Sequence, residues 1–212
     1  MDGLNPRIVI TGGPGSGKTS LIEALSAAGH PVEPEAGRAV IRSEQAVDGD
    51  ALPWKDRALF AARMAERDMA AHARCDDARR PVFFDRGLPD VVGYLRLSGL
   101  PVPETLDRGA RTLRYRPTVF IAPFWPEIFT RDAERRQDAT EARRTVEAMA
   151  AVYPAYGYSL IELPKASVSD RMAFVLERLR SRALRRIHPP CGLVTGQAAR
   201  ADGMQGSHLS EP

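Results

Sequence analysis

One stretch near the N-terminus constrains this chain more than any other: residues 12–19 read GGPGSGKT. The stretch follows an apolar run, IVI at 8–10, and precedes residues 20–25, which have the pattern of a helix. Strand, glycine-rich turn, lysine, hydroxyl residue and helix are the context of the phosphate-binding loop G-x-x-x-x-G-K-[ST]. Its glycines let backbone N–H groups approach a phosphate, and the helix N-terminus adds unpaired N–H groups. The pattern therefore predicts a site for a nucleoside triphosphate.

Each residue of this loop has an expected part in that site. Lys18 would reach the β- and γ-phosphates, and the Thr19 hydroxyl would bind Mg²⁺. The sequence has no guanine-reading Asn-Lys-x-Asp motif, which favours ATP over GTP. We therefore expect ATP and Mg²⁺ as cofactors. The residues expected to surround the nucleotide are Gly12, Gly13, Pro14, Gly15, Ser16, Gly17, Lys18, Thr19 and Ser20.

The rest of the chain alternates apolar runs with helical patterns. A continuous apolar run such as 81–85 is typical of a strand that is buried on both faces of a parallel sheet. The alternation predicts an α/β fold with a parallel sheet of about five strands, wrapped on both faces. Expected strands lie at 7–11, 31–35, 81–85, 118–122 and 158–163. Expected helices lie at 18–28, 38–44, 54–79, 89–98, 104–115, 127–153 and 167–186.

The expected helix at 54–79 carries a stripe of large side chains at roughly helical spacing. We interpret this stripe as core and not as a ligand site. It consists of Leu59, Phe60, the aliphatic stem of Arg63, Met64 and Met69.

Composition suits a soluble domain with an appendage. The chain has 212 residues and a net charge of +3, a weak preference for anionic partners that phosphate ligands alone would explain. Cys75 and Cys191 lie far apart without a C-x-x-C spacing, which favours a reduced, cytoplasmic chain without a zinc site. We expect residues 1–186 to form one domain. Residues 187–212, with few large apolar residues, should be a mostly disordered tail.

Acidic residues fall at the carboxyl ends of two expected strands, where ligands of parallel sheets bind. Asp85 is the expected partner of Mg²⁺, and a simple strand-end turn aspartate is the alternative. Glu35 could accept the proton of a substrate hydroxyl that attacks the γ-phosphate. We expect only one of Glu33 and Glu35 to point into the cleft, on the argument that neighbours along a strand alternate, and Glu35 is the better candidate because it lies at the edge of the loop. Two solvated surface acids remain the alternative for Glu33 and Glu35.

Arginines near the expected site suggest further contacts to anions. Arg86 could hold an anionic substrate or a transferring phosphoryl group, or it could pair with a nearby acid. Arg131 and Arg135 lie in a charged run, which is either a solvated helix or a lid that brings an arginine onto the γ-phosphate. The arginines of 178–186 could touch nucleic acid or anionic lipid, but solvated cations at a helix C-terminus are the favoured interpretation.

Several of these stretches together resemble a known family. The loop, PEAGR at 34–38 and FFDRGLPD at 83–90 are similar to small AAA-type ATPases related to the kinase domain of NadR. DAERR at 132–136 and GYSLIELP at 157–164 fit the same pattern, so that the resemblance covers roughly 6–182. Thymidylate and deoxynucleoside kinases share the acid–arginine pair.

The resemblance implies a kinase-like P-loop NTPase fold of three layers, with an arginine-bearing lid and a base loop near 164–168. It also implies that Lys18 and Thr19 serve phosphate and Mg²⁺, Asp85 the metal or acceptor, and Arg86 the substrate.

Two functions of different classes fit these observations. The first is an ATP- and Mg²⁺-dependent kinase for a nucleoside-like small molecule, with a catalytic set of Lys18, Asp85, Glu35, Arg86, Arg131 and Arg135. The second is a nucleotide-switched binding module, or a slow ATPase or GTPase. A weaker third is a GTPase that docks to membrane or nucleic acid. A closed acceptor pocket between Glu35, Asp85 and the helices at 55–75 and 88–98 would favour the kinase.

Overall fold

The computed structural model describes residues 5–76, 78–129 and 138–187. The chain divides into two compact units, Met1–Glu177 and Arg178–Pro212. The described part of the second unit is the second half of the last helix, α7 (Val168–Ile187). The expected tail at 187–212 lies, after its first residue, outside the described residues. The expected boundary between domain and tail therefore stays a prediction.

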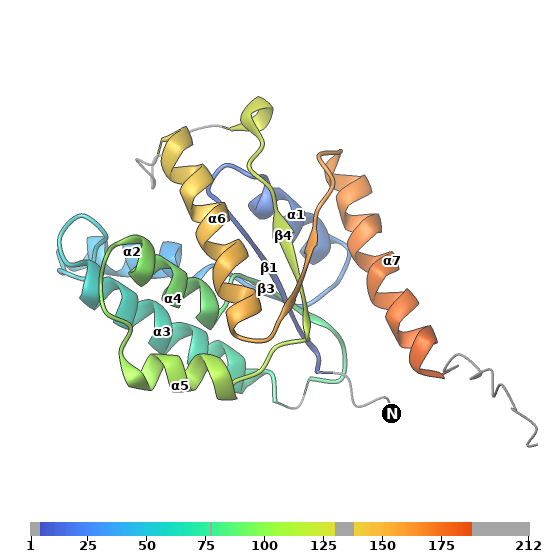
Figure 1. Cartoon of the computed structure of the whole chain (residues 1–212), viewed down its shortest axis with the longest axis horizontal. Coiled ribbons are helices and arrows are strands. Elements are labelled where there is room, and N and C mark those ends of the chain that lie inside the picture. The colour runs from blue at the N-terminus through green and yellow to red at the C-terminus, as the bar shows by residue number, and fades with distance from the viewer. Residues whose placement is uncertain (1–4, 77, 130–137, 188–212) are drawn as a thin grey trace, which may run out of the picture. The chain divides into compact units, whose positions relative to one another are not determined.

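Five parallel strands form one sheet in the first unit, in the order β2-β3-β1-β4-β5. Parallel neighbours need crossover connections, and helices between the strands supply them (Figure 1). This confirms the predicted α/β fold with a five-stranded parallel sheet. The strands are β1 (Arg7–Gly12), β2 (Val32–Glu33), β3 (Val82–Asp85), β4 (Thr118–Ala122) and β5 (Ser159–Glu162).

Helices cover both faces of this sheet. Helix α1 contacts β1, β2 and β3, whereas α6 contacts β1, β4 and β5 and packs closely against α4. Helix α3 packs on α4 and is itself covered by α2. The helices of the first unit are α1 (Lys18–Ala27), α2 (Ala36–Ala46), α3 (Arg57–Arg74), α4 (Leu88–Leu97), α5 (Glu104–Thr112) and α6 (Ala139–Ala155), with a short 3-10 helix at Pro126–Ile128. None of the described helices is both long and apolar enough to cross a membrane.

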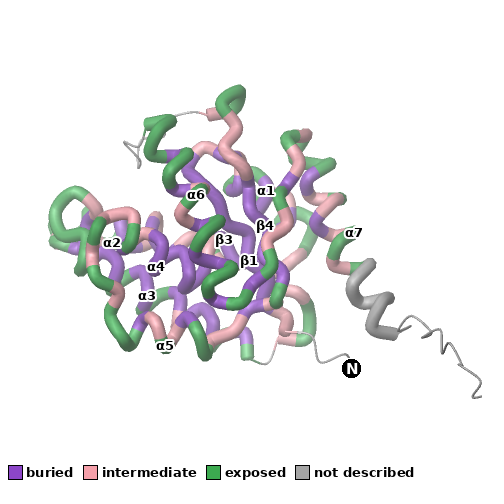
Figure 2. The backbone as a smooth tube through the Cα atoms, viewed as in Figure 1, coloured by how far each residue is buried: buried purple, intermediate pink, exposed green. Residues whose placement is uncertain are grey.

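The central strands are buried at every position, as the tube in Figure 2 shows. Because side chains alternate along a strand, Val9, Phe84 and Val119 join the main core with α3, α4 and α6. Ile8 and Ile10 point to the other face and are fully buried there. Burial on both faces explains why these strands read as continuous apolar runs.

Helix α3 is shorter than the sequence predicts, and the stripe assigned to it is partly wrong. Asp56 caps the helix, because its side chain accepts a hydrogen bond from the Leu59 N–H at 2.9 Å, so the helix cannot begin at Trp54. Leu59 and Arg63 are exposed. Phe60 and Met64 are buried as predicted, but they also line a cavity. The interpretation of the stripe as core alone is therefore incomplete.

Other elements also differ from the prediction in their bounds. The strand expected at 31–35 is β2, which ends at Glu33, and the helix expected at 38–44 is α2, which begins at Ala36 because the chain turns into the helix after Glu35. The helix expected at 104–115 ends at Thr112, and the one expected at 127–153 is α6, which begins at Ala139 after the Asp138 cap. Ser167 caps α7 as predicted, because its Oγ accepts a hydrogen bond from the Asp170 N–H at 3.2 Å.

Candidate functional site

The phosphate loop (residues 12–19) connects β1 to α1 and folds around its own lysine. The Lys18 side chain is buried, and its Nζ donates hydrogen bonds to the Gly13 carbonyl and to Ser16 Oγ. Ser16 Oγ in turn donates to the Gly13 carbonyl at 2.8 Å. Thr19 and Ser20, in the first turn of α1, are exposed. The loop therefore holds its lysine in place while it leaves two hydroxyl residues accessible.

None of the four glycines of this loop has room for a side chain, and Gly13 and Gly17 show which helices take up the space. A Cβ at Gly13 would lie 2.5 Å from the Ala142 carbonyl oxygen of α6. A Cβ at Gly17 would lie 2.6 Å from Arg171 Nη1, and Gly17 has a φ of 75°, which side chains rarely allow. The loop is thus packed tightly against α6 and the start of α7.

Asp85 lies at the carboxyl end of β3, next to the strand that leads into the loop. It is in register with Ile10 of β1 and is buried. A carboxylate and the Thr19 hydroxyl are oxygen ligands of the kind that Mg²⁺ prefers, so the residues fit this ion. In the described part of the chain, no group of three or more His, Cys, Asp or Glu residues is arranged to hold a metal.

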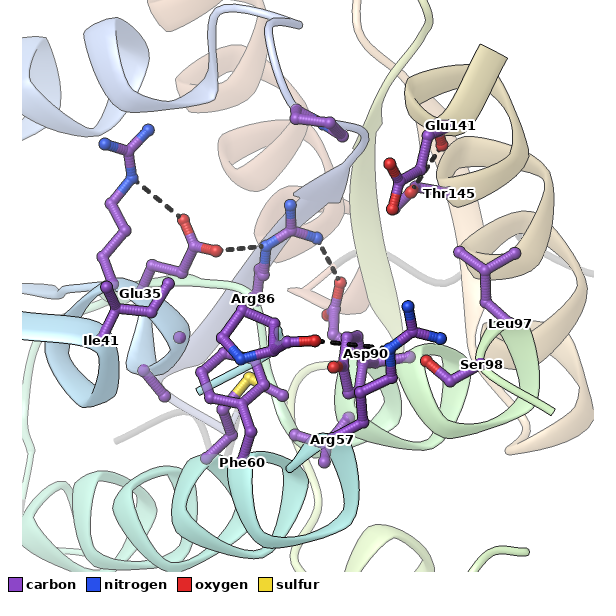
Figure 3. A pocket seen from close by; sticks show the side chains of 18 of the residues that line it. Glu35, Ile41, Arg57, Phe60, Arg86, Asp90, Leu97, Ser98, Glu141 and Thr145 are labelled. Carbon is purple, nitrogen blue, oxygen red and sulfur yellow. Dashed lines mark hydrogen bonds and ion pairs between the residues drawn. The ribbon is translucent and has the colours of Figure 1, made fainter. Parts of the chain in front are cut away.

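Arg86 joins two carboxylates at the mouth of a cavity (Figure 3). Its Nε donates to Glu35 Oε1 at 3.1 Å and its Nη1 to Asp90 Oδ1 at 3.0 Å. Glu35 also pairs with Arg38 Nε at 3.5 Å. Burial alone would lower the pKa of Arg86, but the charges of Glu35, Asp90 and Asp85 raise it above its usual range. Arg86 has a φ of 76°, a strained conformation of the kind that gathers at functional sites.

Asp90 anchors this arrangement. Its carboxylate accepts hydrogen bonds from Thr11 Oγ1, the Gly87 N–H, Arg86 and the Tyr153 hydroxyl. Burial and the charge of Asp90 raise the pKa of Tyr153 well above its usual range, which keeps this hydroxyl a donor. Donors from β1, from α6 and from the turn between β3 and α4 therefore fix the position of Asp90, which in turn holds Arg86.

The cavity itself has a volume of about 550 Å³, within the usual range for small-molecule sites. It lies among α2, α3, α4 and α6, and Pro14 brings the phosphate loop to its edge. Charged side chains gather at one end, and Figure 3 shows Glu35, Arg86 and Asp90 there. The apolar part of the wall is formed by Trp54, Phe60, Met64, Tyr94 and Met149.

Not every residue predicted for the site lies at this cavity. Glu35 does, whereas Glu33 does not line it and pairs with Arg74 at 2.8 Å. The predicted reason, alternation along one strand, is wrong, because residues two apart on a strand share a face. The two acids part because β2 ends at Glu33, whereas Glu35 lies beyond the strand as the N-cap residue of α2. Asp85 does not line the cavity but lies beside the loop. Arg131 and Arg135 lie outside the described residues. Arg144 of α6, further along the same charged region, is an arginine that does line the cavity.

Two residues near the site were missed by the sequence analysis. Asp68 of α3 is buried and lines the cavity, and its signal was an acid four residues after Met64 on the apolar face of the helix. Arg171 of α7 is 2% exposed, and its Nη1 donates to the Gly17 carbonyl at 3.2 Å. Burial lowers the pKa of Arg171. No local pattern marks Arg171, because its contact spans most of the chain.

Solved structures with a similar fold are small-molecule and nucleotide kinases. Deoxyadenosine kinase from M. mycoides has a TM-score of 0.60 at 13% identity, over 82% of this chain and 99% of that one. Thymidylate kinase from Candida albicans has a TM-score of 0.62 at 12% identity, over 85% of this chain and 93% of that one. NadR in complex with NR has a TM-score of 0.63 at 18% identity, over 84% of this chain and 51% of that one.

These likenesses confirm the kinase-like P-loop fold that the resemblance implied. No curated protein matches the chain in sequence. Residues 7–171, most of the first unit, match the family described as AAA domain. The match includes the phosphate loop, Glu35, Arg86 and the helices around the cavity. This chain belongs to the AAA domain family.

Proposed function

We propose that the protein is a kinase that transfers the γ-phosphoryl group of ATP to a hydroxyl group of a nucleoside-like small molecule. The observation that carries this proposal is the cavity of about 550 Å³ at the edge of the phosphate loop, with Glu35 and Arg86 at its charged end. A protein that only binds or hydrolyses a nucleotide needs no second cavity of this size beside the loop.

The nucleotide would bind to the backbone N–H groups of the phosphate loop and the start of α1. Lys18 would turn from the Gly13 carbonyl to the β- and γ-phosphates, and Thr19 and Asp85 would hold Mg²⁺. When bound there, Mg²⁺ would supply positive charge that neutralises the phosphates. ATP is preferred over GTP because the sequence lacks the guanine motif.

The acceptor would lie in the cavity with its hydroxyl group at Glu35. In the transfer, the hydroxyl oxygen forms a bond to the γ-phosphorus, the bond from that phosphorus to the bridging oxygen of ADP breaks, and Glu35 takes the hydroxyl proton. Arg86 would hold Glu35 in position and stabilise the charge of the transferred group. Arg144 of α6 lines the cavity. It would contact the γ-phosphate, the role that the sequence analysis gave to Arg131 and Arg135.

The experiment is ATP turnover with Mg²⁺, alone and with a panel of nucleosides, deoxynucleosides and ribosylnicotinamide, with detection of both ADP and phosphorylated product. We expect one compound to stimulate turnover and to give ADP and product in equal amounts. A Glu35→Gln variant should bind ATP normally but lose the stimulated rate.

The opposite outcome is slow hydrolysis that no compound stimulates and that Glu35→Gln leaves unchanged. It would reject the kinase and favour a nucleotide switch or a slow ATPase. Exposed Glu66 offers a matched control, because Glu66→Gln makes the same chemical change on the solvent side of α3.

A further inference from the structure

Asp68 is a buried acid in the wall of the cavity, on the same face of α3 as Phe60 and Met64. It lies on α3 one turn beyond Met64 and two turns beyond Phe60, and all three line the cavity. The residue is only 6% exposed. The helix otherwise buries apolar side chains on this face. Burial of an acid there costs free energy of folding unless a hydrogen bond or an ion pair compensates it.

No such partner occurs among the described residues. Asp68 forms no hydrogen bond or ion pair within the described part of the chain, although Arg86 is near enough to act on its charge. The two hydrogen bonds of Arg86 to carboxylates go to Glu35 and Asp90 instead. Asp68 therefore presents a carboxyl group to the cavity with its hydrogen-bonding capacity unused.

The surroundings of Asp68 are negatively charged. Asp90 of α4, Glu35 before α2 and Asp85 of β3 act on it with like charge, and Arg86 acts on it with opposite charge. Tyr115, before β4, lies near it. Arg57, on the same helix, is exposed and donates to the Pro53 carbonyl. Burial, followed by the charges of Asp90 and Glu35, raises the pKa of Asp68 well above its usual range.

On the basis of the kinase function proposed above, we propose that Asp68 recognises the ring of the acceptor and selects a basic, amino-substituted nitrogen heterocycle. Adenine and cytosine have this chemistry, and hypoxanthine and uracil are their oxo counterparts. The proposal thus names a residue for acceptor specificity, distinct from Glu35, which would take the hydroxyl proton.

The hydrogen-bonding groups of such a ring match those of the Asp68 carboxyl group. A ring nitrogen beside an exocyclic amine presents one acceptor and one donor, and a protonated carboxyl group presents one donor and one acceptor in return. The surrounding carboxylates favour a basic ring that can share the proton, and they disfavour the electronegative carbonyl of an oxo ring. Phe60 and Tyr94, whose rings meet edge to face at 5.5 Å, give the cavity aromatic surfaces for a planar ring.

The test is equilibrium binding of adenosine, inosine, cytidine and uridine to the full chain with Mg²⁺ and a non-hydrolysable ATP analogue. We expect at least one amino nucleoside to bind about tenfold more tightly than its oxo counterpart, the effect of one good hydrogen bond. Asp68→Leu should remove this preference. Asp68→Asn should keep part of it, because an amide also offers a donor beside an acceptor.

Glu66→Gln is the control, since Glu66 lies on the exposed side of the same helix. Thermal unfolding of each variant checks that it is folded. A preference that survives Asp68→Leu in a folded protein, or tighter binding of the oxo nucleosides, overturns the proposal for Asp68. Absence of binding for all four probes also overturns it, whereas the kinase proposal would then still stand or fall on the wider turnover panel.

Discussion

The Arg86 side chain donates a hydrogen bond to Glu35 at 3.1 Å, while the backbone of Arg86 has a φ of 76°. Residues other than glycine adopt such a φ only under strain. The strain is the consequence of a sharp exit from β3 into α4, and the hydrogen bonds to Glu35 and Asp90 hold the residue in it. The fold thus stabilises a conformation that the arginine itself disfavours.

This relationship predicts that two variants of Arg86 differ in stability although both lose activity. Because glycine accepts a positive φ, Arg86→Gly should be more stable than Arg86→Ala by about 1 kcal/mol. Both variants should lose acceptor-stimulated turnover, since Glu35 loses the hydrogen bond from Arg86 and keeps only its ion pair with Arg38 among the partners described above. Urea denaturation measures the difference in the free energy of unfolding. If the glycine variant were less stable than the alanine variant, the backbone at position 86 would not be strained.

Removal of the Lys18 charge should abolish ATP binding. The ammonium group is the charged donor of the phosphate loop, and a charge-assisted hydrogen bond contributes about 1.5–3 kcal/mol. Because Lys18 would donate to both the β- and the γ-phosphate, we expect Lys18→Ala to weaken ATP binding by about 100-fold or more. Isothermal titration with Mg²⁺ and ATP measures this. Lys55→Ala, at an exposed lysine that pairs with Asp48, serves as the control. Unchanged affinity in Lys18→Ala would refute the assignment of the loop.

Loss of the Asp90 carboxylate should destabilise the whole first unit. Asp90→Ala leaves the Thr11 and Tyr153 hydroxyl groups and the Gly87 N–H buried without their acceptor, and it removes one partner of Arg86. We expect a loss of about 3–5 kcal/mol, the usual cost of breaking a buried charged network. Thermal and urea unfolding test this. A loss below about 1 kcal/mol would show that the network contributes little.

Asp68 should make stability depend on pH. Its pKa in the folded protein is raised above the ordinary value of 3.8, so the folded state keeps a proton that the unfolded chain has lost. As the pH rises from about 4 towards the raised pKa, the wild type should lose stability relative to Asp68→Asn, which cannot titrate. Below about pH 4 this loss of stability should vanish, because Asp68 is then protonated in both the folded and the unfolded protein.

Unfolding of both proteins at pH 4, 6 and 8 measures this dependence. Glu66→Gln, an exposed acid on the same helix, should show no such trend. If Asp68→Asn gains nothing between pH 4 and pH 8, the carboxyl group of Asp68 is not held protonated by the fold.

The sequence by itself determined the parts of this protein that depend on local patterns. The apolar runs that end at Gly12, Asp85 and Ala122 predicted the buried parallel strands, because a strand covered on both faces must be apolar throughout. The phosphate loop was recognisable because its function requires particular residues at fixed spacing within one turn.

Only the tertiary structure decided which distant side chains meet. Glu35 and Arg86 are separated by 51 residues, and nothing in either segment specifies that they pair. The contact of Arg171 with Gly17 spans 154 residues and was invisible in the sequence. Asp68 carried a faint signal as an acid among apolar neighbours, but the packing of α3 against α4 turned it into a group of the cavity wall. Side-chain proximity of this kind follows from the crossing of packed elements, which no short pattern encodes.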